Sequence, residues 1–277
     1  MTMPIPHPFQ FEAKQIQALI DQSDGDSDIF VNRLHHSGLT HISFSQVYAF
    51  ETCPRQYYLR YILGVEINPV PEYFIKGKAL HRTIANAYRA HMDGRDFNED
   101  IISYDEIYPD SPAGNHLRNG YQTLRQNMLP SDEVIGIEKP FVYLMNEEIP
   151  PVVGVIDLIL RRGDRLILID HKTGRDFYQP EILQMAVYLN YLRSTGISGE
   201  CEFYYDSYRW VENLARIRKP AFSRQQMMIS DTDAGNQARR LADGYEGIRI
   251  LRQGRLPGKT GECFRCAYRN NCWREKL

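Results

Sequence analysis

The stretch that decides the fold is residues 154–174, which read G-V-I-D-L-I-L-R-R-G-D-R-L-I-L-I-D-H-K-T-G. Two apolar runs rich in β-branched residues flank residues 162–164 (R-G-D), and such a polar, glycine-containing triplet is typical of a tight turn. The stretch therefore predicts a β-hairpin. Each predicted strand carries one carboxylate in apolar surroundings, Asp157 in the first strand and Asp170 at the end of the second.

These two aspartates predict a metal site. An ionised carboxylate is costly to bury without a counter-charge, and two strands that bring Asp157 and Asp170 together place like charges side by side. A divalent cation removes this repulsion, because it takes hard oxygen ligands. Lys172 leaves the second strand on the same face as Asp170, within reach of a phosphate or water beside such an ion. This arrangement suits metal-dependent phosphodiester hydrolysis, although a solvated aspartate and a turn lysine at a strand end give the same local sequence.

The composition is that of an ordinary folded chain. The 277 residues are 43% hydrophobic and 25% charged, and 33 basic against 35 acidic residues give a net charge of −2. These values exclude wholesale disorder, collagen and coiled coil, and no apolar run approaches the roughly 18 residues of a membrane span. A basic segment followed by an apolar one is missing at the N-terminus, so we expect no signal peptide, no membrane contact and a cytoplasmic location.

The neutral total charge does not itself predict a nucleic-acid partner, so DNA contacts would have to come from local basic clusters. Two such clusters occur, one made of Arg55, Arg60, Lys76, Lys78 and Arg82, the other of Arg249, Arg252, Arg255 and Lys259. They predict phosphate contacts, and the 18 tyrosines offer stacking surfaces for unpaired bases. The chain has no G-x-x-x-x-G-K-[ST] motif, so we expect no ATP motor in it.

The motifs G-V-I-D, D-H-K-T-G and Q-M-A-V-Y follow one another in this order. In this series the sequence resembles the PD-(D/E)xK nuclease superfamily, in its RecB-like branch, over about residues 43–277. Gln184 and Tyr188 match the branch's Q-x-x-x-Y motif, and their spacing places both on one helix face. The branch's helix histidine corresponds to His81, in the string G-K-A-L-H.

The resemblance implies a role for each matched residue. The implied metal ligands are three side chains and one backbone carbonyl, from His81, Asp157, Asp170 and His171. Lys172 is the implied catalytic lysine, and Gln184 and Tyr188 brace the site or contact the DNA strand. Glu138, on the preceding predicted strand, either reinforces the site or pairs with Lys139. The implied ion is Mn²⁺ or Mg²⁺.

Three of the five cysteines lie close together near the C-terminus, where Cys263, Cys266 and Cys272 form C-x2-C-x5-C. Cys53 lies far upstream, in C-P-R-Q-Y-Y. Four thiolates can hold either zinc or an iron–sulfur cluster, and free thiols are the third alternative. One cysteine before the hairpin and three after it resembles the iron–sulfur nuclease group, which includes the CRISPR-associated adaptation nucleases and the AddB-type nuclease domains. That resemblance implies a [4Fe-4S] cluster held by these four residues, and such a link between distant segments favours a structural role.

The sequence as a whole predicts an α/β fold with a mixed central sheet flanked by helices, the restriction-endonuclease-like PD-(D/E)xK core. Strands are expected at 134–145, 152–160, 165–169 and 201–208, and helices at 76–92, 112–128, 181–192 and 223–253. We expect four regions. They are a poorly defined leader (1–40), an N-terminal helical region with the first cysteine and the motif histidine (41–130), the nuclease core (131–222), and a C-terminal helix with the cysteine tail (223–277).

The predicted function is metal-dependent DNA cleavage by an exonuclease that acts on single-stranded DNA. The resemblance to the adaptation nucleases further implies trimming of DNA ends for CRISPR spacer acquisition, with a CRISPR integrase complex as partner. The same nuclease in recombination, repair or a virus is one alternative. A non-catalytic DNA-binding module and a structural zinc protein are two others.

Overall fold

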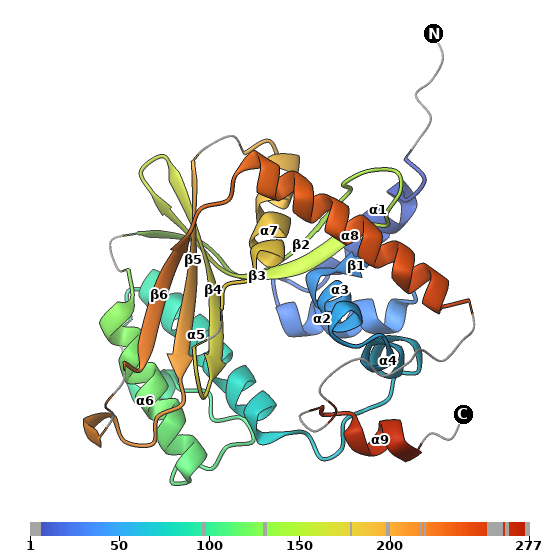
Figure 1. The fold of residues 1–277 in the computed structure, drawn as a ribbon. Helices are drawn as coiled ribbons and strands as arrows, with labels where there is room; N and C mark the ends of the chain where they lie inside the picture. The colour runs from blue at the N-terminus through green and yellow to red at the C-terminus, as the bar shows by residue number, and fades with distance from the viewer. Residues whose placement is uncertain are drawn as a thin grey trace.

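The computed structural model describes residues 7–95, 98–129, 132–177, 179–197, 200–216, 218, 220–253, 263 and 266–274. Its centre is a six-stranded mixed sheet with helices on both faces (Figure 1). The strands are β1 (Ile42–Ser43), β2 (Glu133–Tyr143), β3 (Val152–Arg162), β4 (Arg165–Gly174), β5 (Cys201–Arg209) and β6 (Phe222–Met227). The helices are α1 (Gln10–Asp21), α2 (Ser27–Ser37), α3 (Phe44–Thr52), α4 (Pro54–Tyr57), α5 (Glu72–Met92), α6 (Pro112–Asn127), α7 (Ile182–Ser194), α8 (Asp231–Leu251) and α9 (Arg269–Arg274).

The predicted hairpin forms from β3 and β4. Arg162 pairs with Arg165 across the turn, and Gly163 has a φ of 59°, a left-handed conformation that glycine adopts without steric cost. From β4 the sheet continues through β5, which is parallel to it, to the antiparallel edge strand β6. The mixed sheet expected from the sequence is therefore confirmed, as are the four predicted strands.

The two edges of β3 are paired differently. β2 runs antiparallel along nearly the whole of one edge. On the other edge, β1 pairs with Val152 and Val153, whereas β4 pairs only with residues 158–162. Residues 154–157 lie between these two ladders, so their polar groups on this edge must bond to something other than a neighbouring strand. Asp157 is the last residue of this gap.

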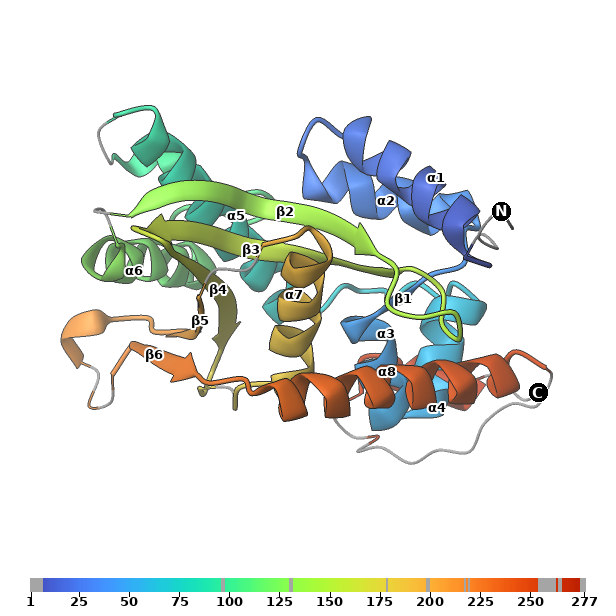
Figure 2. The same cartoon turned by 90° about the horizontal axis from the view of Figure 1, so that it is seen from above.

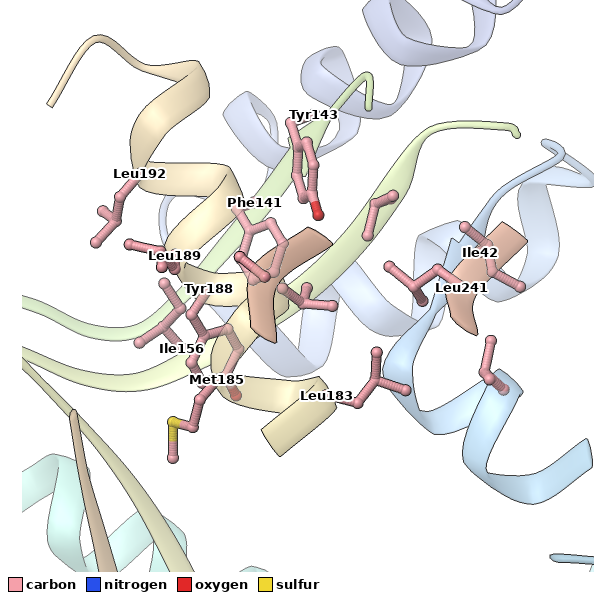
Figure 3. Packing of buried hydrophobic residues seen from close by; sticks show 14 of the residues in the cluster. Ile42, Phe141, Tyr143, Ile156, Leu183, Met185, Tyr188, Leu189, Leu192 and Leu241 are labelled. Atoms are coloured by element: carbon pink, nitrogen blue, oxygen red, sulfur yellow. The ribbon is translucent and has the colours of Figure 1, made fainter. Parts of the chain in front are cut away.

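Each face of the sheet has its own apolar core. The first lies under α3, α7 and α8, and Figure 3 shows Phe141 and Tyr143 of β2 pointing toward Leu189 and Tyr188 of α7. The second lies under α5 and α6, on the opposite face (Figure 2). The site residues of β3 and β4 are therefore sandwiched between helical layers.

The alternation of side chains along β3 breaks at Asp157. Ile156 packs in the core under α7, whereas Leu158, two residues on, packs in the core under α5 and α6. A regular strand would place both on one face. β2 breaks at the same level, because Ile137 and Phe141 also belong to opposite cores, and Glu138 between them has a φ of 46°. In both strands the side-chain alternation is therefore reversed at the same level, at Asp157 in β3 and at Glu138 in β2.

Residues 10–37 differ from the sequence-based expectation of a poorly defined leader. They form α1 and α2, which pack Ile16, Phe30 and Leu34 against Val153 of β3. Each of these helices also carries apolar residues that stay exposed, among them Phe11 and Val31, so the sequence pattern alone is weak and the contact with β3 decides their structure. The proposed division of the chain into four regions stays a prediction.

The helix predicted over residues 223–253 is wrong in its first part. Residues 222–227 form β6, and Arg224 lies opposite Asp206 of β5. Two hydrogen bonds of 2.8 and 2.7 Å join the Arg224 guanidinium to the Asp206 carboxylate. The helix α8 begins only at Asp231, after a capping box formed by Ser230 and Asp233. The sheet therefore extends past the core boundary expected at residue 222.

Every helix in the described part of the chain is either too short or too polar to cross a lipid bilayer.

Replacing Arg224 with alanine should lower the free energy of unfolding by about 3–5 kcal/mol, because it leaves the fully buried Asp206 without its counter-charge. The matched control is Arg193→Ala, whose ion pair with Asp231 is exposed and should contribute at most about 1 kcal/mol. Urea unfolding followed by circular dichroism measures both. Equal losses for the two variants would contradict the burial argument.

Candidate active site

Asp157 and Asp170 face each other where the β3–β4 ladder ends. Leu158 and Ile169 are the last paired residues, and the two aspartates are next along each strand. Instead of a backbone pair, one Asp157 oxygen accepts a hydrogen bond from the backbone N–H of His171, at 2.7 Å. The side chain of Asp157 thus occupies the position that a strand would otherwise fill. The pairing predicted from the hairpin brings the two carboxylates together.

Asp170 is almost completely buried, with 1% of its surface exposed. One oxygen accepts a hydrogen bond of 2.6 Å from the amide of Gln184. The other lies 2.6 Å from the Lys172 ammonium, in an ion pair. Burial raises the pKa of Asp170 to about 6, the Lys172 charge opposes this rise, and the Asp157 charge adds to it. The site therefore holds an excess of negative charge that Lys172 only partly offsets.

Gln184 and Tyr188 hold these groups from α7. The Gln184 amide donates to Asp170 and to the Tyr188 hydroxyl, and its carbonyl accepts from the Lys172 ammonium at 3.1 Å. The Tyr188 hydroxyl in turn donates to the Val155 carbonyl at 3.0 Å, inside the unpaired gap of β3. The spacing of four residues, which predicted one helix face for both side chains, is confirmed by these contacts. Their arrangement favours bracing of the site.

His81 reaches the carboxylates from the opposite helical layer. It lies on α5, and its Nδ1 atom is 3.7 Å from the Asp157 carboxylate. About 30% of its side chain is exposed, so the imidazole lines an accessible edge of the site. The histidine singled out by the G-K-A-L-H string is therefore brought to the predicted aspartate by a helix on the other face of the sheet.

The His171 side chain lies near His81, with 6.3 Å between the two ring centroids. Its ring is buried beside Tyr208, and burial lowers its pKa to about 4, although the Asp206 charge opposes this. The backbone N–H of His171 faces Asp157, and in a strand the carbonyl of the same residue points to the same side. His171 therefore adjoins the site through its ring as well as its backbone, and the ligand role of its carbonyl stays a prediction.

Glu138 is partnered by Arg89 and lies 3.7 Å from that guanidinium, so the alternative of a pair with Lys139 is not what forms. Burial raises the pKa of Glu138, and the neighbouring charges of His81 and Asp157 also act on it. The side chain therefore lies at the α5 edge of the site, near His81.

The four motif cysteines line one cavity of about 700 Å³ between α4, the start of α5 and α9. Cys53 is buried at the start of α4, and Cys263, Cys266 and Cys272 come from the C-terminal segment. Burial raises the pKa of the Cys266 thiol, and the other three thiols are close enough to raise it further. The structure thus brings together residues from both ends of the chain, while Cys201 lies apart, on β5.

The sequence matches the PD-(D/E)XK nuclease superfamily over residues 41–273. The chain belongs to this superfamily. No curated protein matches the sequence. Among solved structures, a protein from Eubacterium rectale, provisionally named an exonuclease, is 8% identical, with 88% of this chain and 91% of that chain covered and a TM-score of 0.56. A protein named SSO0001 is 17% identical over 96% of this chain and 99% of that chain, but its TM-score of 0.38 is too low to establish a common fold.

The nuclease is a phosphodiesterase whose superfamily generally uses divalent metal ions on DNA. The donor types suit such an ion, since two carboxylates and the His81 imidazole lie at the gap in β3. Within the described ranges, no three His, Cys, Asp or Glu side chains are arranged to hold an ion as they stand. The Lys172 ammonium lies against Asp170 instead, and it supplies the positive charge there.

Part of the first basic cluster of this nuclease is neutralised by ion pairs with acidic residues of the same chain. Arg82 is ion-paired with both Asp28 and Asp105, and Lys78 lies 3.3 Å from Asp28. Lys76 is paired with Glu72 at 2.8 Å. The acidic residue of α2, which no sequence motif marks, thus offsets two cations of α5. Two residues of the second cluster, Arg255 and Lys259, lie outside the described part of the chain.

The hydroxyl of Tyr188 should contribute more to stability and to DNA hydrolysis than its aromatic ring does. Tyr188→Phe removes the donor to the Val155 carbonyl, so it should lower the free energy of unfolding by about 1–3 kcal/mol and slow DNA hydrolysis by loosening Gln184. Tyr191→Phe on the same helix is the control, because its ring stacks on Phe141 and its hydroxyl has no hydrogen bond within the described residues. Thermal unfolding and a fluorescent DNA assay compare the two. Similar effects from both variants would remove the hydroxyl from the argument.

Proposed function

We propose that this nuclease is a metal-dependent exonuclease that degrades single-stranded DNA from its ends. The observation that carries the proposal is the convergence of Asp157, Asp170 and Lys172 at the gap in β3, with His81 beside them. The ion would be held by these two carboxylates, the His81 imidazole and the His171 carbonyl. Mn²⁺ and Mg²⁺ both suit such ligands.

A bound divalent ion would activate water and neutralise charge on the scissile phosphate. The residues of the chain do the rest. The Lys172 ammonium moves its contact from Asp170 to the scissile phosphate. There it stabilises the negative charge that develops on the non-bridging oxygens. Gln184 keeps its hydrogen bonds to both Asp170 and Lys172, so these two side chains hold their positions relative to each other. Burial in a site of low polarity strengthens each of these interactions.

The preference for single strands is supported by the surface that leads to the site. Tyr73 and Phe74, at the start of α5, are about half exposed, and their rings lie 4.6 Å apart. Gly77, one turn further along α5, lies against Thr173 of β4, so this aromatic pair is close to the site strand. Aromatic rings stack on unpaired bases and tolerate any sequence. An exonuclease is also what the Eubacterium rectale protein of similar fold is provisionally named.

The cysteine cavity supports a [4Fe-4S] cluster held by Cys53, Cys263, Cys266 and Cys272. Zinc would draw four thiolates to within about 2.3 Å of one point, whereas a cluster is larger and keeps its ligands further apart. All four cysteines line one cavity of about 700 Å³, which has room for the larger group. The cluster would link α4 to the C-terminal segment and stabilise the layer beside the site.

For the biological role we propose trimming of DNA ends for CRISPR spacer acquisition, together with an integrase complex. The support is the resemblance of the motif series and of the split cysteine pattern to the adaptation nucleases. Co-expression with a CRISPR integrase tests the partnership by co-purification. Failure to associate would leave the nuclease chemistry intact and favour a role in recombination or repair.

Lys172→Ala should slow degradation of a labelled single strand in Mn²⁺ by about 100- to 1000-fold, as removal of a charge-stabilising donor does. The control is Lys14→Ala, since that lysine is exposed on α1 and belongs to neither basic cluster. Products resolved by length separate progressive trimming from internal cuts, and a duplex of the same sequence tests strand preference. Undiminished activity in Lys172→Ala would overturn the catalytic assignment, and an inactive wild type would favour a DNA-binding module.

Wild-type protein purified without oxygen should be brown and contain about four iron and four sulfide per chain. Cys266→Ser should lose most of this iron, whereas Cys201→Ser, on β5 and outside the cavity, should retain it. Iron, zinc and sulfide analysis provides the measurement. A colourless wild type with one zinc per chain would contradict the cluster and establish the structural zinc alternative.

A further inference from the structure

Arg55 is a buried cation in the cysteine cavity. It follows Cys53 by two residues, lines the same cavity as the four cysteines and is only 9% exposed. Its Nη2 atom lies 3.5 Å from the Cys272 carbonyl, at the limit of a hydrogen bond, and its buried Nε–H has no partner. Among the described residues, no carboxylate forms an ion pair with Arg55.

Such an arrangement is unfavourable unless an anion occupies the cavity. A guanidinium offers five N–H donors in a fixed plane and stays charged at any ordinary pH. Burying it without an anion costs several kcal/mol, so buried arginines are normally paired. Arg224 shows the usual solution in this same chain, since both of its bonds go to the Asp206 carboxylate. Within the described ranges Arg55 has no equivalent carboxylate, and it shares its cavity with the four cysteines.

We propose that Arg55 is the charge partner of the cysteine-held cluster and donates N–H hydrogen bonds to its sulfur atoms. This inference rests on the cluster proposed above. Four thiolates around a [4Fe-4S]²⁺ core give a net charge of −2, so the cavity then contains the anion that the guanidinium lacks. The long hydrogen bond to the Cys272 carbonyl already holds Arg55 beside one of the four ligand residues.

Two consequences follow from the charge. A positive group beside the cluster stabilises the reduced form, which carries one more negative charge, and so raises the reduction potential. Hydrogen bonds to the sulfur atoms also strengthen metal ligation, as partners of ligands do in other metal sites. Arg55 therefore acts as a positioning residue for the cluster and has no part in DNA hydrolysis.

The test compares Arg55→Gln with Arg60→Gln in the full chain after anaerobic reconstitution. Arg60 lines the same cavity but is exposed and lies over the Tyr61 ring, 4.9 Å from its centre, which makes it a matched control. In Arg55→Gln the midpoint potential should fall, and an iron chelator should bleach the cluster about tenfold faster. Arg60→Gln should behave as the wild type in both measurements.

Arg55→Lys provides a second variant that keeps the charge but loses the planar fork of donors. It should retain the wild-type potential more closely than Arg55→Gln while bleaching faster than the wild type, and it keeps the test decisive if Arg55→Gln does not fold. Wild-type potential and bleaching rate in both variants would overturn this inference alone. A wild type that takes up no iron would instead overturn the cluster, and this inference with it.

Discussion

The structure depends on a short interruption in strand pairing along one edge of β3. On this edge, the backbone at residues 154–157 lies between the residues paired with β1 and those paired with β4 and has no strand partner. The other edge is paired with β2. Polar groups in this gap must still be satisfied. Asp157 accepts from the His171 backbone, and Tyr188 donates to the Val155 carbonyl. A sheet that continued regularly would close this gap and leave no room for two carboxylates.

The gap is held open from two sides. Gln184 and Tyr188 reach it from α7, and His81 reaches it from α5 on the opposite face. Because each helix is also anchored in its own apolar core, the polar groups are fixed by packing that they do not themselves supply. The same packing buries Asp170, which raises its pKa and makes a cation beside it favourable. Rigid support and an unsatisfied negative charge are what a metal-dependent hydrolase requires.

The cysteine cavity and the catalytic gap share α5. The cavity lies against the start of this helix, at Tyr73 and Phe74, and His81 follows two turns later. Anything that fixes the cysteine cavity therefore also limits how the start of α5 can move relative to β4. This continuity means that the packing of the cysteine cavity and the position of His81 depend on the same helix. The exposed aromatic pair, Tyr73 and Phe74, lies on the same helix as His81.

The hairpin, the mixed sheet and the pair of aspartates with Lys172 could be predicted from local patterns, whereas His81, Gln184 and Tyr188 were implied by the family resemblance. Continuous apolar runs and a glycine turn both act over a few residues. Only the tertiary structure decided that residues 10–37 are helical, that residues 222–227 join the sheet and that Glu138 pairs with Arg89. Tertiary packing also brings His81 of α5 to Asp157 and places Arg55 in the same cavity as the four cysteines. These features depend on contacts between residues far apart in the chain, and no local pattern contains that information.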